Sequence, residues 1–102
     1  MTKEEQIYDY LITYCVGKEN KVKNKYLRLL FNIGSDRALR EKIQNIRESK
    51  EFKLVIGSIS GKDGGFYICE TPEEVQETID NIKRRANQML RMTHIIEWKK
   101  NL

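Results

Sequence analysis

The chain has few of the residues that build metal sites, disulfide frameworks or catalytic centres. Its 102 residues include two cysteines and one histidine. Cys15 and Cys69 lie far apart without a CxxC spacing or a histidine nearby, so we interpret both as small core residues. A lone His94 supplies neither a metal triad nor a Ser/His/Asp arrangement, and the glycines of residues 61–65 lack the GK[ST] of a phosphate-binding loop. We therefore expect no enzyme activity, no metal and no cofactor.

Long apolar runs are also missing, and there is a single proline. No stretch approaches the roughly 20 apolar residues of a membrane span, and residues 2–5 are polar where a secretory signal would turn apolar. With 39% hydrophobic and 33% charged residues, the composition fits one folded, helix-rich domain. We expect a soluble cytoplasmic protein of a bacterium or a bacterial host cell, with no membrane contact.

Positive charge is concentrated in one third of the chain. Residues 17–50 carry ten basic side chains against four acidic ones, whereas residues 1–16 have a net charge of −2 and the remainder is neutral. A basic block in a small protein is typical of a polyanion binder, and a solvated helical surface is the alternative on charge alone.

The order of periodic segments and breakers predicts an α+β, mainly α fold. Apolar residues at helical spacing predict helices over residues 3–16, 24–31 and 36–49. Gly17 ends the first, Gly34 supplies a positive φ for the turn after the second, and Ser35 caps the third. Two helices joined by a short glycine-containing turn are the helix-turn-helix signature. Residues 53–59 and 66–69 predict a β-hairpin, and Thr71-Pro72-Glu73-Glu74 predicts the capping box of a last helix.

The third helix has a face that matches the chemistry of the DNA major groove. With Leu39, Ile43 and Ile46 on the buried stripe, a helical wheel places arginines and a glutamine on the opposite side. Arginine can donate two hydrogen bonds to guanine and glutamine can pair with adenine, while either can reach a phosphate. A salt-bridged solvent face is the alternative. The outward residues are Arg37, Arg40, Gln44 and Arg47, of which the first three are expected to read bases and Arg47 to contact phosphate.

The hairpin after this helix distinguishes a winged helix-turn-helix from a plain one. Its tip contains Lys62, which can reach an adjacent phosphate, and Asp63, which opposes such a contact. Whether the wing touches DNA stays open. The predicted DNA-binding set is Ser35, Arg37, Arg40, Gln44, Arg47 and Lys62.

Residues 26–40 (YLRLLFNIGSDRALR), 61–68 (GKDGGFYI) and 71–75 (TPEEV) together resemble the small winged helix-turn-helix proteins of bacteriophages and mobile elements. The resemblance implies that the third helix enters the major groove and that the wing lies over neighbouring DNA. It also implies a role in the transcription or replication of phage or plasmid DNA, without saying which.

The last helix carries an apolar seam at heptad spacing. Seam residues recur every three or four positions from Val75 to Ile96, and a helix of this length exceeds what so small a core can cover. We expect residues 1–71 to form the winged domain and residues 72–102 a dimerisation helix of the same compact unit. Lys83 and Arg85 disfavour a parallel zipper, leaving an antiparallel or globular homodimer, or else a helix folded back on its own domain. The expected dimerisation residues are Ile82, Ala86, Met89, Leu90, Thr93 and Ile96.

The sequence therefore predicts a homodimeric protein that binds duplex DNA sequence-specifically. Because winged helices also serve as adaptors in replication and transcription assemblies, a protein-interaction adaptor is the alternative. Such a role would imply a replication or transcription protein as partner.

Overall fold

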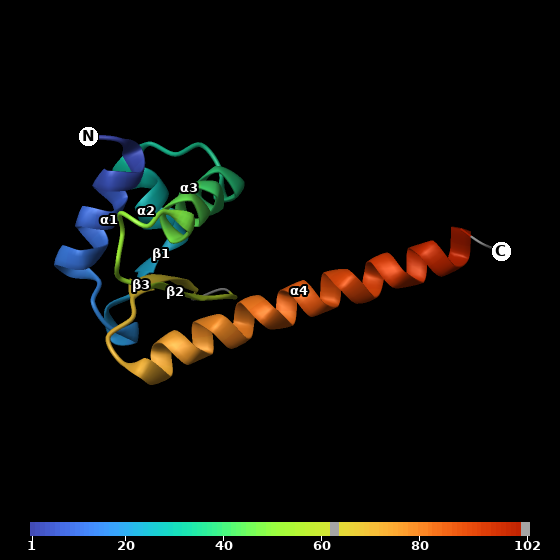
Figure 1. The fold of residues 1–102 in the computed structure, drawn as a ribbon. Helices are drawn as coiled ribbons and strands as arrows, with labels where there is room; N and C mark the ends of the chain where they lie inside the picture. Colours follow the sequence, from blue (N-terminus) through green and yellow to red (C-terminus); the bar gives the residue numbers. More distant parts are fainter. Residues whose placement is uncertain (62–63, 101–102) are drawn as a thin grey trace.

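The computed structural model describes residues 1–61 and 64–100, and it shows a helical body from which one long helix departs (Figure 1). The fold is α+β and mainly α, as expected. The elements in chain order are α1 (Lys3–Tyr14), the 3₁₀ helix η1 (Lys18–Asn20), β1 (Val22–Lys23), α2 (Asn24–Phe31), α3 (Asp36–Glu48), β2 (Ile56–Ile59), β3 (Gly65–Ile68) and α4 (Pro72–Lys100).

The first three helices pack around one core. The predicted apolar stripe of α3 is confirmed, since Leu39, Ile43 and Ile46 are all buried in this core. The Ser35 cap is also confirmed, because its hydroxyl accepts a hydrogen bond from the Ala38 amide at 3.1 Å. An ion pair also joins α3 to α1, with Lys42 of α3 lying 3.3 Å from Glu4 of α1. The face of α3 opposite the stripe is thereby held outward.

The turn between α2 and α3 differs from the expectation in which residue bends it. Asn32, and not Gly34, adopts the left-handed conformation, with φ of 53°. Asparagine adopts this region more readily than most residues because its short polar side chain can form local hydrogen bonds. The guanidinium of Arg28 then clamps the turn by donating to the carbonyls of Ile33 at 3.4 Å and Gly34 at 2.8 Å and pairing with Asp36 at 3.4 Å.

The strands form a three-stranded antiparallel sheet in the order β1-β3-β2. The hairpin of β2 and β3 was expected, although β2 begins at residue 56 and not 53. β1 was missed, and it pairs Val22 with Phe66 of the central strand. Helix α1 also ends earlier than expected, because the Cys15 carbonyl accepts from the Ile68 amide and the chain joins the sheet there. These pairings bring residues 15–23 beside β3.

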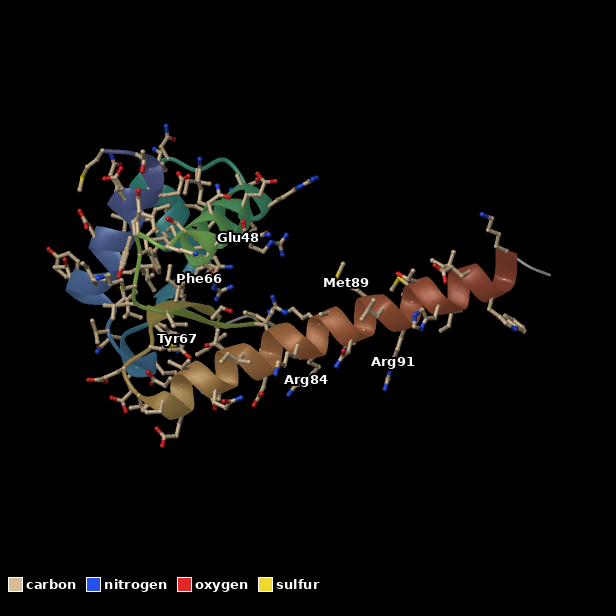
Figure 2. The ribbon with its side chains drawn as sticks, viewed as in Figure 1. Glu48, Phe66, Tyr67, Arg84, Met89 and Arg91 are labelled. Atoms are coloured by element: carbon tan, nitrogen blue, oxygen red, sulfur yellow. The ribbon has the colours of Figure 1, made fainter. Side chains whose placement is uncertain are left out.

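The sheet separates the three helices from the start of α4. Along β3, Phe66 belongs to the core under the helices, whereas Tyr67 points toward α4 (Figure 2). Thr78 of α4 is buried on this second side, with its hydroxyl 3.6 Å from the Cys69 sulfur. The first turns of α4 are therefore docked on the sheet.

The capping box expected at the start of α4 is half formed. The Thr71 hydroxyl accepts from the Glu74 amide at 3.2 Å, as predicted. The Glu74 carboxylate does not return to Thr71, but accepts from the amides of Glu70 at 2.7 Å and Lys18 at 3.0 Å. These bonds lower the pKa of Glu74 and tie α4 to η1. The carboxylate thus links two segments far apart in sequence.

Beyond its first three turns, α4 leaves the body and extends alone (Figure 1). Every side chain from Ile82 to Lys100 is exposed. The helix is not folded back on its own domain, and the chain measures 54 × 32 × 30 Å along its principal axes. Among the described residues, none of the helices combines the length and the hydropathy that crossing a membrane requires.

Candidate nucleic-acid interface

Three of the predicted residues share the outward face of α3. Arg37, Arg40 and Gln44 are all exposed, and their stretch begins directly after the Ser35 cap. Because the buried stripe and the ion pair with α1 fix the rotation of α3, these side chains are presented together to solvent. The structure therefore brings together the residues that the sequence assigned to base reading.

Acidic neighbours hold two of these side chains. Arg37 lies 3.6 Å from Glu41, one helical turn further along, and Gln44 donates to Glu48 at 3.0 Å. Within residues 1–61 and 64–100, Arg40 makes no hydrogen bond or ion pair. Exposed ion pairs one turn apart contribute only about 0.3–0.5 kcal/mol, so the Arg37 pair is easily exchanged for another anion.

Arg47 takes a different place from the one expected. Its guanidinium turns to the sheet and donates to the Ile56 carbonyl from two nitrogens, at 3.0 and 2.7 Å, and to the Ser58 hydroxyl at 3.4 Å. Burial, followed by the charge of Arg85, lowers the pKa of this guanidinium. Since β2 is an edge strand, Arg47 satisfies a carbonyl there and joins α3 to the hairpin. We therefore leave Arg47 out of the phosphate-contacting set.

Replacing Arg47 with methionine is expected to lower the free energy of unfolding by about 1–3 kcal/mol, because the Ile56 carbonyl loses its donors. The matched control is Arg40→Met, which removes an exposed arginine from the same helix and should change stability by less than about 0.5 kcal/mol. Urea unfolding followed by circular dichroism measures both. Equal stability of the two variants would contradict the bridging role of Arg47.

A second basic feature lies where α2 begins. Lys23, Lys25 and Arg28 line a cleft of about 590 Å³ together with Asp36 and the hairpin residues Gly61 and Gly64. The basic count of this segment was noted from the sequence, but its position beside the start of α3 depends on β1, which the sequence did not reveal. Lys62 lies outside the described residues.

Several basic side chains of the block are used inside the molecule. Lys42 pairs with Glu4, and Lys18 lies 3.1 Å from Glu77 of α4. With Arg28 in the turn and Arg47 on β2, the charge available to a polyanion is smaller than the count suggests. It is concentrated on α3 and at the start of α2.

One basic residue outside the block faces the same region. Arg85 of α4 is near enough to Arg47 for its charge to lower the pKa of that guanidinium. A heptad reading of α4 treats Arg85 as a flank of the apolar seam, so its approach to α3 was missed. Its charge therefore lies near the Arg47 guanidinium, which bonds the Ile56 carbonyl of β2.

The expected dimerisation residues all belong to the exposed part of α4. Met89 points to one side of the helix, and Arg84 and Arg91 point to the other (Figure 2). The seam therefore runs along a face free of these two arginines. The expected dimerisation residues, all of them exposed, are Ile82, Ala86, Met89, Leu90, Thr93 and Ile96.

The described residues define an α+β, mainly α protein with a basic helical face, and in residues 1–61 and 64–100 no cluster of three or more His, Cys, Asp or Glu side chains is arranged to hold a metal. Comparison with protein-family models, with curated proteins and with solved structures finds no match.

Proposed function

We propose that the protein is a winged helix-turn-helix DNA-binding protein that reads duplex DNA through α3 as a homodimer. The observation that carries the proposal is the outward face of α3, where Arg37, Arg40 and Gln44 are exposed together and Arg40 makes no hydrogen bond or ion pair with the rest of the described chain. The order of α2, a short turn, α3 and a β-hairpin supports it, since this arrangement presents a helix to the major groove.

We assign different contacts to the basic groups within this proposal. Arg37 and Arg40 lie in the first half of α3, which enters the groove first, and serve as guanine readers. Gln44, one turn further, matches adenine. Lys25 at the start of α2 and Arg85 on α4 flank this face and serve as phosphate contacts. Base contacts specify the site, and the flanking charges position the protein on it.

The biological role that we propose is regulation of transcription or replication of phage or mobile-element DNA. It depends on the resemblance of residues 26–40 and 61–75 to the small winged-helix proteins of such elements. The sign of regulation does not enter the proposal.

The salt dependence of duplex affinity tests this function. Each neutralised phosphate contributes a slope of roughly −0.9 to a plot of log K against log salt, so four to six contacts per subunit give about −7 to −11 for the dimer. Fluorescence anisotropy with a pool of random 30-base-pair duplexes measures the slope. Sequencing of the bound fraction then shows whether one sequence is enriched. A flat salt response with no enriched sequence would remove the DNA-binding proposal.

One surface favours the second candidate, a protein-interaction adaptor. A groove of about 510 Å³ between α1 and α2 is lined by Tyr10, Tyr14, Tyr26 and Leu30, of which the last three are exposed. The ring centres of Tyr10 and Tyr14 are 5.1 Å apart. An adaptor would bind duplex DNA weakly even at low salt and would lose its protein partner when Tyr26 is replaced with alanine.

A further inference from the structure

The apolar seam of α4 is covered at one end and open at the other. At its start, Val75 is half-buried and Thr78, on the flank of the seam, is 4% exposed against the sheet, whereas the next seam residue, Ile79, is 38% exposed. Further along, Ile82 is 47% exposed and Met89 69% exposed. The side of α4 that packs on its own sheet therefore continues outward as an unpartnered stripe.

The exposed half of α4 needs a partner on physical grounds. In proteins, most of the stability of a helix comes from packing of its apolar face and not from intrinsic helix propensity. This half nevertheless presents large apolar side chains to solvent: Ile82, Met89, Leu90, Met92, Ile95, Ile96 and Trp98. A second helix with the same heptad spacing can pack its side chains between these residues, which are Ala86, Met89, Thr93 and Ile96.

We propose that the partner is the α4 helix of a second copy, packed antiparallel on this stripe. A parallel copy would run its own residues 72–82 along the seam face at the level of Val75 and Thr78, where the sheet already lies. An antiparallel copy places its body at the far end and meets only the open half. The sheet at the covered end of the seam thus favours the antiparallel orientation of the second α4 helix. This inference rests on the homodimer proposed above.

The spacing of the seam also fixes the register. The four seam residues from Ala86 to Ile96 are centred on Arg91, so in the register that we propose Ala86 packs on Ile96 of the second copy and Met89 on its Thr93. On one flank Leu90 meets Leu90 of the second copy. The same flank places Lys83 beside the second copy's Glu97, which gives two charge-complementary pairs in each dimer.

The opposite flank is apolar at its centre and basic at its ends. Met92 meets Met92 of the second copy there, and Arg85 lies beside the second copy's Lys99. The dimer contains two such like-charged pairs, which oppose pairing, and two Lys83–Glu97 pairs, which favour it. Because Arg85 also approaches Arg47, this basic flank faces the body of its own chain. Phosphates bound on that side would neutralise it.

The register sets the distance between the two bodies. Thr78 lies thirteen residues from the midpoint, so the two copies of Thr78 are roughly 39 Å apart along the paired helices at a rise of about 1.5 Å per residue. One turn of B-DNA spans about 34–36 Å. The points at which the two α4 helices dock on their own sheets are therefore a little more than one turn of B-DNA apart.

Single cysteines in the full-length chain test the orientation. After mild oxidation without DNA, Leu90→Cys is expected to form a disulfide-linked dimer, because residue 90 meets its own copy. Ile82→Cys should link no more than the unsubstituted chain, whose Cys15 is buried and Cys69 half-buried. A parallel pairing would link Ile82→Cys to itself as readily, and this result would overturn the proposal. A Leu90→Cys chain that stays unlinked, with a monomer in sedimentation equilibrium, would overturn it as well.

Charge reversal tests the register independently. Lys83→Glu alone or Glu97→Lys alone places like charges together twice in each dimer, so we expect the dimer dissociation constant to rise on the order of 10-fold. The double variant should return within about 3-fold of the original value. Both positions are exposed, so circular dichroism should show an unchanged fold. Single variants without effect would overturn this register.

The two proposals fail separately, because the cysteine and charge experiments contain no DNA. A linked antiparallel dimer that shows a flat salt response would keep the helix pairing and remove the DNA-binding function. A monomer with a steep salt response would do the reverse.

Discussion

The double variant Arg37→Ala and Arg40→Ala is expected to raise the dissociation constant for the selected duplex at least about 100-fold. A bidentate arginine–guanine contact contributes about 1–3 kcal/mol of discrimination, and the variant removes two from each reading helix. The fold should persist, since both side chains are exposed and neither touches the core of Leu39, Ile43 and Ile46. Anisotropy with the selected duplex and with a scrambled one measures the loss of affinity and of preference.

The matched control removes the same charge from the other side of the molecule. Arg84→Ala with Arg91→Ala takes two arginines from the face of α4 opposite Met89 (Figure 2). Both double variants lower the net charge by the same amount, so the comparison separates an effect of total charge from an effect of where the charge lies. Loss of sequence preference only in the α3 variant would support base reading. Equal losses in both would reduce the role of α3 to charge alone, and unchanged binding of the α3 variant would contradict the proposal.

The single variants separate the two arginines. Arg37 exchanges its ion pair with Glu41 for a base, whereas Arg40 enters the groove without losing a partner. An exposed pair of this kind is weak, so the difference amounts to a few tenths of a kcal/mol. Arg40→Ala should therefore cost slightly more affinity than Arg37→Ala, and Glu41→Gln should increase affinity slightly.

The helices were predictable because their information is local. Apolar residues at helical spacing located α1, α2, α3 and α4, and Ser35 and Pro72 marked the starts of the last two within a residue. The buried stripe of α3 followed from the same periodicity, and with it the outward face. A face opposite a stripe needs no knowledge of the rest of the fold.

The sheet was harder to predict because its pairings are nonlocal. β1 is two residues long and lies in a lysine-rich segment, so nothing local marks it as a strand. It exists because Phe66, more than forty residues away, lies opposite Val22. The position of Lys23 and Lys25 beside the start of α3 depends on this pairing.

The sequence also did not show which basic side chains are free to contact DNA. Arg47 has the helical position of a reading residue, yet it bonds the Ile56 carbonyl. The wheel gives its direction but not the edge strand that lies within its reach. Conversely, Arg85 looked like a seam flank, and only the docking of α4 on the sheet brings it near α3.

Gly65→Ala is expected to lower the free energy of unfolding by about 1–3 kcal/mol, the range for forcing a methyl group into a closely packed site. Gly65 lies opposite Lys23 where β1 and β3 pair, and a Cβ there would overlap the Val22 carbonyl. Backbone atoms cannot move aside as a flexible side chain can, so relief requires separating the strands. Urea unfolding measures the loss, and amide exchange shows whether protection falls first around residues 22–23.

Gly34→Ala is the control, because a Cβ there meets open space and the residue has no positive φ. It should leave stability unchanged or raise it by about 0.4–1 kcal/mol, since alanine restricts the unfolded chain. The comparison also bears on DNA binding. β1 runs directly into α2, so its release frees the start of α2 and the cleft that contains Lys25. Gly65→Ala should therefore weaken duplex affinity under conditions where it is still folded, while Gly34→Ala should not. A Gly65→Ala chain of unaltered stability would contradict the close approach of β1 and β3, and one that is destabilised yet binds normally would show that α2 contributes no phosphate contact.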